Sequence, residues 1–283
     1  MTIDIITLFP NMFFGPFDES IIKRAQDKGI VTINVHNLRD WALDSYGTVD
    51  DRPYGGGIGM VLRPEPIVNA LKSIHSASPL LVGDPPAGEA GGQGEVDMLT
   101  KALQNNDKRS VILTSAAGKP FSQQKAQELS QKDHLVFICG HYEGVDQRIA
   151  DHYADEELSI GDYVLTGGEL PTMVMIDSIV RLIPGVLSKP DAVKLESFSQ
   201  ISNPPIPSTP SHPSSSKTSG PFVSSGPSGT SLLEAPHYTR PDTFDGHTVP
   251  EVLKNGNHAE IEKWKQEEAK KRTKKNRPDL LTP

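Results

Sequence analysis

Four stretches of the chain combine glycine with polar residues in a way that suits ligand binding. They are TVDDRPYGGGIGM (Thr48–Met60), ICGHYEGVDQR (Ile138–Arg148), SIGDYVLTGGELP (Ser159–Pro171) and EAPHYTRP (Glu234–Pro241). The first has no Gly-Lys-Ser/Thr after its glycines and no GxGxxG between a strand and a helix, which excludes a Walker A loop and a dinucleotide fingerprint. Its glycines predict a tight turn or a binding loop, and Asp50, Asp51 and Arg52 just before them favour the binding loop.

Apolar strands position the second and third stretches. Ser110–Thr114 and His134–Cys139 are predicted strands, and a short strand is expected within Glu157–Leu165. Ligands of open α/β sheets bind at the carboxyl ends of the strands. The turn TSAAG, which ends at Gly118, and the loops that contain Gly140 and Gly161 follow these strands. We therefore expect three loops to converge on one pocket, with small residues that let backbone amides approach a ligand.

The rest of the first 198 residues alternates between strands and helices. Further strands are predicted at Ile3–Phe9 and Ile30–Val35. Helices are predicted at Asp18–Lys28, Pro64–Ser76, Ser122–Gln131, Val145–Tyr153 and Glu169–Leu182, with a loop at Gly83–Val96. This alternation indicates an α/β domain with a mostly parallel sheet.

A different composition begins at residue 199. In Ser199–Ser231, 12 of 33 residues are Ser and seven are Pro, too little apolar surface to offset the entropy of ordering. We predict a disordered linker at 199–231 between domains at 1–198 and 232–283. The last domain is expected to be small and helical, with a helix at Asn257–Lys275 that starts like a capping box at Asn257 and Glu260.

Composition and charge narrow the class of protein. Of 283 residues, 36% are hydrophobic and 23% charged, and a single cysteine, Cys139, excludes a disulfide framework within the chain. The first residues, MTIDIITLFP, do not resemble a signal peptide, and no apolar run reaches the ~18 residues of a membrane span. We expect a cytoplasmic protein without a membrane partner. Its net charge of −8 argues against nucleic acid, but residues 254–277 are locally basic, which fits either phosphate contacts or a solvated helix face.

Six motifs, in order, resemble one family. TVDDRPYGGG, CGHYEG, SIGDYVLTGGELP, RLIPGVL (Arg181–Leu187), PHYTRP and GNHAEI are similar to those of bacterial tRNA (guanine-N1)-methyltransferases. These enzymes act on N1 of the guanosine at tRNA position 37, 3′ of the anticodon. The resemblance covers nearly the whole chain, except Gly83–Asp107 and the linker. It implies a sheet whose C-terminal part forms a deep trefoil knot of the SPOUT type.

The resemblance also implies a methyl donor, S-adenosylmethionine, bound inside the knot. SIGDYVLTGGELP would be the loop that wraps it. By motif, the expected contacts are Leu113, Thr114, Ser115, Gly140, Tyr142, Glu143, Ile160, Gly161, Tyr163, Leu165, Gly167, Gly168 and Pro171. Asp50 and Arg52 are expected to hold the target guanosine or its neighbour.

Two residues match the family's catalytic positions. Glu234 would take the N1 proton, because guanine N1 is not a nucleophile while it is protonated. Arg181 would stabilise the charge that develops on guanine O6. Each also has a structural alternative: Glu234 could cap the turn that follows it, and Arg181 could pair with Asp177 one helical turn earlier.

Partners follow from the same resemblance. A homodimer is expected, with each active site built at the subunit interface and Glu234 supplied to the partner's methyl donor. The basic helix after Asn257 would hold the anticodon stem through its phosphates. The family is associated with Mg²⁺, but no carboxylate cluster in the sequence is a specific signal for a metal, and no metal ligands are assigned.

The chain departs from the family at several positions. Glu234 stands where many members have Asp, Ala116 and Ala117 replace Pro and Gln, Tyr46 replaces His, and Ile58 replaces Pro. The linker is longer, and members usually continue past the position of Pro283, so weak affinity for tRNA is expected. Two alternatives stay open: a tRNA-binding paralogue with impaired catalysis, and a SPOUT-type methyltransferase with another RNA target.

Overall fold

The computed structural model describes residues 1–77, 108–189, 196–198 and 232–281. The chain divides into two compact units, Met1–Ser188 and Lys189–Pro283. The predictions for Gly83–Asp107 and for the linker at 199–231 lie outside the described residues.

A five-stranded parallel sheet forms the centre of the first unit. It consists of β1 (Thr2–Thr7), β2 (Thr32–Asn37), β5 (Arg109–Pro120), β6 (His134–Cys139) and β7 (Glu156–Ser159), in the order β2-β1-β6-β5-β7. All four neighbouring pairs are parallel. β6 is buried along its whole length, as expected for a central strand with helices on both faces. The predicted α/β fold with a mostly parallel sheet is confirmed.

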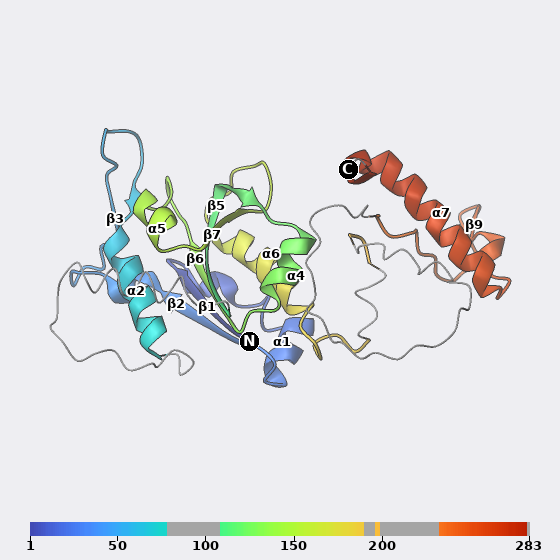
Figure 1. Ribbon diagram of the computed structural model, residues 1–283, viewed down its shortest axis with the longest axis horizontal. Coiled ribbons are helices and arrows are strands. Elements are labelled where there is room, and N and C mark those ends of the chain that lie inside the picture. The colour runs from blue at the N-terminus through green and yellow to red at the C-terminus, as the bar shows by residue number, and fades with distance from the viewer. Residues whose placement is uncertain (78–107, 190–195, 199–231, 282–283) are drawn as a thin grey trace, which may run out of the picture. The chain divides into compact units, whose positions relative to one another are not determined.

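Helices cover both faces of this sheet (Figure 1). On one face lie α1 (Ser20–Asp27), α4 (Gln123–Leu129) and α6 (Glu169–Val180), which share an apolar core with Ile5, Ile112 and Phe137. On the other lie α2 (Pro64–Ala77) and α5 (Gln147–His152), packed over Ile6, Val111 and Ile138. The two cores hold the carboxyl ends of β5, β6 and β7 in fixed register.

β5 is longer than predicted. Its expected end at Thr114 is only the first part of the strand, because Lys119 and Pro120 pair with β7 again after a register shift. Thr114 and Lys119 both lie opposite Leu158, so residues 115–118 bulge out of the sheet. A Cβ at Gly118 would stand 2.6 Å from the Leu158 backbone nitrogen, so only glycine lets the bulge close against β7.

Polar side chains from β1, β2 and β6 form a cluster within the sheet. His36 and His134 each donate a 2.6 Å hydrogen bond to the buried Asp4 carboxylate. Burial acts to raise the pKa of Asp4, but these hydrogen bonds outweigh it and hold that pKa well below its usual range. Beside them, Arg109 bonds His75 of α2 at 2.9 Å.

Short elements flank the sheet in the same unit. The 3₁₀ helices η1 (Pro10–Phe13) and η2 (Leu38–Trp41) follow β1 and β2. β3 (Asp50–Asp51) and β4 (Val61–Leu62) form an antiparallel pair that closes the first glycine-rich stretch into a hairpin loop. Charge and composition alone did not predict this pairing.

The second unit contains a two-stranded hairpin, β8 (Thr243–Phe244) and β9 (His247–Thr248), the 3₁₀ helices η5 (Glu251–Leu253) and η6 (Pro278–Leu281), and the helix α7 (His258–Asn276). The Asn257 side chain caps α7 by accepting from Ala259 and Glu260 backbone nitrogens, as predicted. Trp264 is half-buried and its ring lies 6.3 Å from that of Tyr238. Across the described residues, no helix is long and apolar enough to cross a membrane.

Candidate active site

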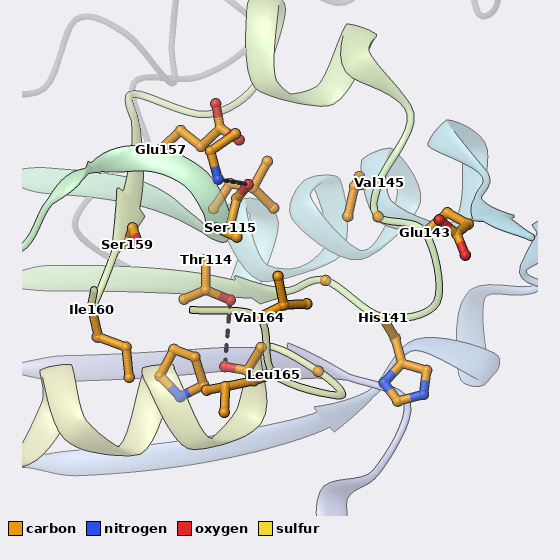
Figure 2. A pocket seen from close by; sticks show the side chains of 18 of the residues that line it. Thr114, Ser115, His141, Glu143, Val145, Glu157, Ser159, Ile160, Val164 and Leu165 are labelled. Carbon is orange, nitrogen blue, oxygen red and sulfur yellow. Dashed lines mark hydrogen bonds between the residues drawn. The ribbon is translucent and has the colours of Figure 1, made fainter. Parts of the chain in front are cut away.

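A pocket of about 400 Å³ lies at the carboxyl ends of β5, β6 and β7. Figure 2 shows Thr114 and Ser115 of β5 on one side and Ile160, Val164 and Leu165 of the β7–α6 loop on the other. All thirteen residues expected to contact the methyl donor line it: Leu113, Thr114, Ser115, Gly140, Tyr142, Glu143, Ile160, Gly161, Tyr163, Leu165, Gly167, Gly168 and Pro171. The three predicted loops therefore meet in one cavity.

The β7–α6 loop is fastened to the ends of the other two strands. The Gly168 backbone nitrogen donates a 2.7 Å hydrogen bond to the Gly140 carbonyl. Thr114 Oγ1 donates to the carbonyls of Ile138 and Gly168, at 3.2 and 3.4 Å. A Cβ at Gly168 would collide with Thr114 Oγ1 and stand 2.8 Å from the Gly140 nitrogen. Glycine at 168 is thus required by the protein's own packing.

A buried carboxylate, that of Glu169, anchors the end of the same loop where α6 begins. Glu169, in the first turn of α6, is 1% exposed, and its Oε1 accepts a 2.8 Å hydrogen bond from Thr7 Oγ1. Thr7 Oγ1 in turn accepts from the Phe9 backbone nitrogen at 2.9 Å. The helix N-terminus also favours the negative charge of Glu169. The start of α6 is therefore tied to the end of β1.

The second glycine-rich stretch connects the pocket to the β3–β4 loop. Backbone nitrogens of Glu143 and Leu62 donate 3.0 Å hydrogen bonds to the carbonyls of Met60 and Gly144 respectively. The Glu143 side chain lies against Gly59, where a Cβ would stand 2.6 Å from its Cγ. The wall that carries Tyr142 and Glu143 is thus fixed to the first glycine-rich stretch.

The predicted substrate residues lie on this hairpin, outside the pocket lining. Asp50 is in β3 and half-buried, and Arg52 follows in the exposed loop. Arg181 is the C-cap of α6, is half-buried, and donates its backbone nitrogen to the Asp177 carbonyl at 3.3 Å. None of these three residues lines the pocket.

Glu234 belongs to the second unit. Its Oε1 lies 2.7 Å from His237 Nε2. Its backbone nitrogen donates to Ser197 Oγ at 3.0 Å, and its carbonyl accepts from Arg272 Nη1 of α7 at 3.3 Å. The backbone at Glu234 is thereby held by α7, and among the described residues the second carboxylate oxygen, Oε2, has no hydrogen-bond donor.

Comparison with known proteins agrees with this geometry. A model of the family "tRNA (Guanine-1)-methyltransferase TrmD" matches residues 1–105 and 90–283. Three relatives named tRNA (guanine-N(1)-)-methyltransferase match 99% of this chain: from Staphylococcus haemolyticus (46% identity, 91% of the relative), Anoxybacillus flavithermus (45%, 91%) and Citrifermentans bemidjiense (42%, 90%). The chain belongs to the tRNA (guanine-1)-methyltransferase family.

The predictions from family motifs missed part of the pocket. His141, Val145, Gln147, Ala150 and Glu157 also line it. His141 lies inside the motif CGHYEG, and its ring stands 4.8 Å from Phe9 and 4.7 Å from Tyr142. Glu157 could have been found from strand alternation, because a buried Leu158 places its neighbour on the opposite face of β7.

Only acids carry formal charge in the pocket lining. Glu143 and Glu157 are its carboxylates, and neither Lys nor Arg lines the pocket among the described residues. At the end of β6, next to the pocket residue Gly140, burial raises the pKa of the Cys139 thiol, which stays neutral. In the described part of the chain, no group of three or more His, Cys, Asp or Glu residues is arranged to hold a metal ion.

Proposed function

We propose that this protein transfers the methyl group of S-adenosylmethionine to N1 of the guanosine at position 37 of tRNA. The observation that carries the proposal is the convergence of all thirteen expected contact residues on one pocket, in a chain of the tRNA (guanine-1)-methyltransferase family. A cytoplasmic location is proposed from the same family resemblance.

The pocket suits a nucleoside-like methyl donor in size and chemistry. Its volume of about 400 Å³ lies in the range of small-molecule sites. Leu113, Ile160, Leu165 and Pro171 offer apolar contacts for an adenine ring. The backbone of Gly140 can approach polar ligand atoms, because glycine has no side chain and the nearest neighbouring side-chain atom, Val145 Cγ2, would stand 3.6 Å from a Cβ there. When bound, the donor supplies an electrophilic methyl group on a sulfonium sulfur.

Glu234 is proposed as the base. Its carboxylate would take the proton from guanine N1, which frees the nitrogen lone pair to form the new bond to carbon. A positioned base typically contributes ~10²–10⁴-fold. His237, 2.7 Å away, would hold Oε1 and orient Oε2 toward the substrate. The hydrogen bond that the Glu234 backbone nitrogen donates to Ser197 and the one that its carbonyl accepts from Arg272 support this role, because they fix the backbone of Glu234.

Arg181 is proposed to stabilise the charge on guanine O6. Loss of the N1 proton moves negative charge onto that oxygen, and a guanidinium can donate hydrogen bonds to it. Arg181 lies at the C-terminal end of α6, whereas the pocket lies at the N-terminal end of that helix, so the role is proposed from the motif RLIPGVL. Asp50 and Arg52 would contact the guanosine or its neighbour from the β3–β4 loop.

The active form is proposed to be a homodimer, with Glu234 of one subunit serving the pocket of the other. Exposed apolar side chains on α6 and next to it support a subunit interface. Leu170 and Val174 of α6 are 49% and 47% exposed, and Phe9, Met12 and Phe14 around η1 are exposed as well. η1 packs against α6, so these side chains belong to one region of the first unit.

The finer architecture is proposed on the family resemblance. The β7–α6 loop would be part of a deep trefoil knot. The domains would span residues 1–198 and 232–283, with a linker at 199–231 between them. Lys and Arg residues of α7 would bind phosphates of the anticodon stem, which positions the tRNA without reading its sequence.

The test is methyl transfer from labelled S-adenosylmethionine to an unmodified tRNA transcript with guanosine at positions 36 and 37. Wild type should modify N1 of guanosine 37, and Glu234→Gln and Arg181→Ala should each lose at least ~10²-fold in kcat. Mapping the product separates the alternatives. Methylation of another nucleotide would support the alternative of a methyltransferase with another RNA target. If the protein binds the donor but transfers no methyl group, the result would support the alternative of a tRNA-binding paralogue with impaired catalysis.

A further inference from the structure

The pocket extends beyond the expected contact residues toward α5. This extension is lined by Glu157 of β7 and by Gln147 and Ala150 of α5. Glu157 lies in register with Leu113 of β5, which is itself an expected contact residue. Its neighbours Glu156 and Leu158 face the opposite side of β7, where Leu158 joins the core with α4 and α6. Strand alternation therefore directs the Glu157 side chain to the pocket side.

The carboxylates of Glu156 and Glu157 differ in their partners. Glu156 pairs with Lys125 of α4 at 2.8 Å. Glu157 is half-buried and forms no ion pair or side-chain hydrogen bond with any residue that the structure describes. Gln147 Nε2 donates its hydrogen bond to Asp151 Oδ1 at 2.9 Å, and the structure shows none from this amide to Glu157. The extension thus holds a carboxylate whose charge no described cation balances.

We propose that Glu157 is a specificity residue that favours the cationic methyl donor over its neutral product. This inference rests on the function proposed above. The donor carries a sulfonium cation in addition to its zwitterionic amino acid end, and the product, S-adenosylhomocysteine, has a neutral thioether. Otherwise the two are alike in shape. The described lining has two carboxylates and neither Lys nor Arg, so it distinguishes the cationic donor from the neutral product by charge. This preference helps a new donor molecule replace the bound product.

The size of the effect follows from Coulomb attraction in a half-buried site. One carboxylate roughly 6 Å from a cation, at an effective dielectric constant of about 40, changes affinity by on the order of tenfold. Salt screens such a pair, so the preference should weaken at high ionic strength. The hydrogen bonds that position the donor's adenine and ribose are common to donor and product and do not contribute to the difference.

Isothermal titration calorimetry on the full-length protein tests the proposal. The probes are S-adenosylmethionine, S-adenosylhomocysteine and an analogue with a protonated amine in place of the sulfonium. Wild type should bind both cations more tightly than the neutral product. In Glu157→Gln, the Kd for each cation should rise roughly three- to tenfold, with the product's Kd within about twofold of wild type. Glu156→Gln is the matched control and should leave all three ratios unchanged.

The outcomes separate this inference from the proposed function. If Glu157→Gln weakens donor and product equally, the residue acts only on the pocket's structure and the inference is wrong. The same holds if wild type binds donor and product equally well. If wild type binds none of the three probes, the proposed methyl-donor site is wrong and the inference falls with it.

Discussion

Gly168→Ala is the sharpest perturbation of the pocket. The added Cβ would collide with Thr114 Oγ1 and stand 2.8 Å from the Gly140 nitrogen and 2.9 Å from the Cys139 Cα. Two of these neighbours are backbone of the central strand β6 or its end, which cannot move cheaply. Overpacking of this kind costs ~1–3 kcal/mol. Weakening the 2.7 Å Gly168–Gly140 hydrogen bond adds about 1 kcal/mol.

The expected total is therefore about 2–4 kcal/mol, which for a unit of this size lowers the melting temperature by roughly 5–15 °C. Differential scanning calorimetry measures this shift, and calorimetric titration should show at least a ~10-fold loss of donor affinity, because the displaced loop forms one wall of the pocket.

Gly140→Ala provides the matched control. A Cβ there would meet the Thr114 carbonyl oxygen at 3.3 Å and Val145 Cγ2 at 3.6 Å, so the neighbouring backbone needs to shift by only a few tenths of an ångström. Its melting temperature should change by less than about 2 °C. Donor affinity should still fall, because the methyl group enters the pocket. Near-normal stability and donor binding in Gly168→Ala would refute the packing argument.

Three further predictions concern the proposed base Glu234, the loss of folding stability at acid pH through Asp4, and the Thr7–Glu169 hydrogen bond at the start of α6. Glu234→Gln should leave the Kd for S-adenosylmethionine within about twofold while kcat falls ~10²–10⁴-fold, measured by single-turnover transfer. Because the folded pKa of Asp4 is lowered, its stabilisation is complete above the ordinary value of 3.8 and is lost as pH falls below it. Asp4→Asn should flatten that acid limb in urea titrations from pH 5 to 2.5, and an unchanged slope would contradict the assignment. Thr7→Val leaves Glu169 without its donor and should cost ~1–3 kcal/mol in the same titration.

Much of the fold was predictable because strand and helix patterns here are local. His134–Cys139 is apolar throughout and is a fully buried central strand with the predicted bounds. Asn257 caps α7 as its spacing to Glu260 indicated. The second part of β5 was not predictable, since Lys119 returns to the sheet only because Gly118 packs on the Leu158 backbone, which lies about 40 positions away in sequence.

The features of the candidate site also divide into those that the sequence could predict and those that it could not. Convergence of three loops follows from parallel strands with glycine-rich ends, and it needs no knowledge of distant contacts. The Thr7–Glu169 hydrogen bond joins residues 162 positions apart, and neither side chain stands out in the sequence. Glu157 escaped prediction because the family motif begins after it, although the alternation around Leu158 fixes its direction.

The glycines in and beside the pocket serve two different needs, and this explains why composition alone could not decide between a turn and a binding loop. On the side where a Cβ would stand, Gly118, beside the pocket, and Gly168, in its lining, are packed against the protein's own atoms, so the fold itself requires glycine there. Gly140 borders the pocket, and a methyl group there would need only a small shift of the Thr114 carbonyl. A glycine that the fold does not require, at the edge of a cavity, is the better indicator of ligand contact. By that criterion the end of β6 is where bound donor should approach the backbone most closely.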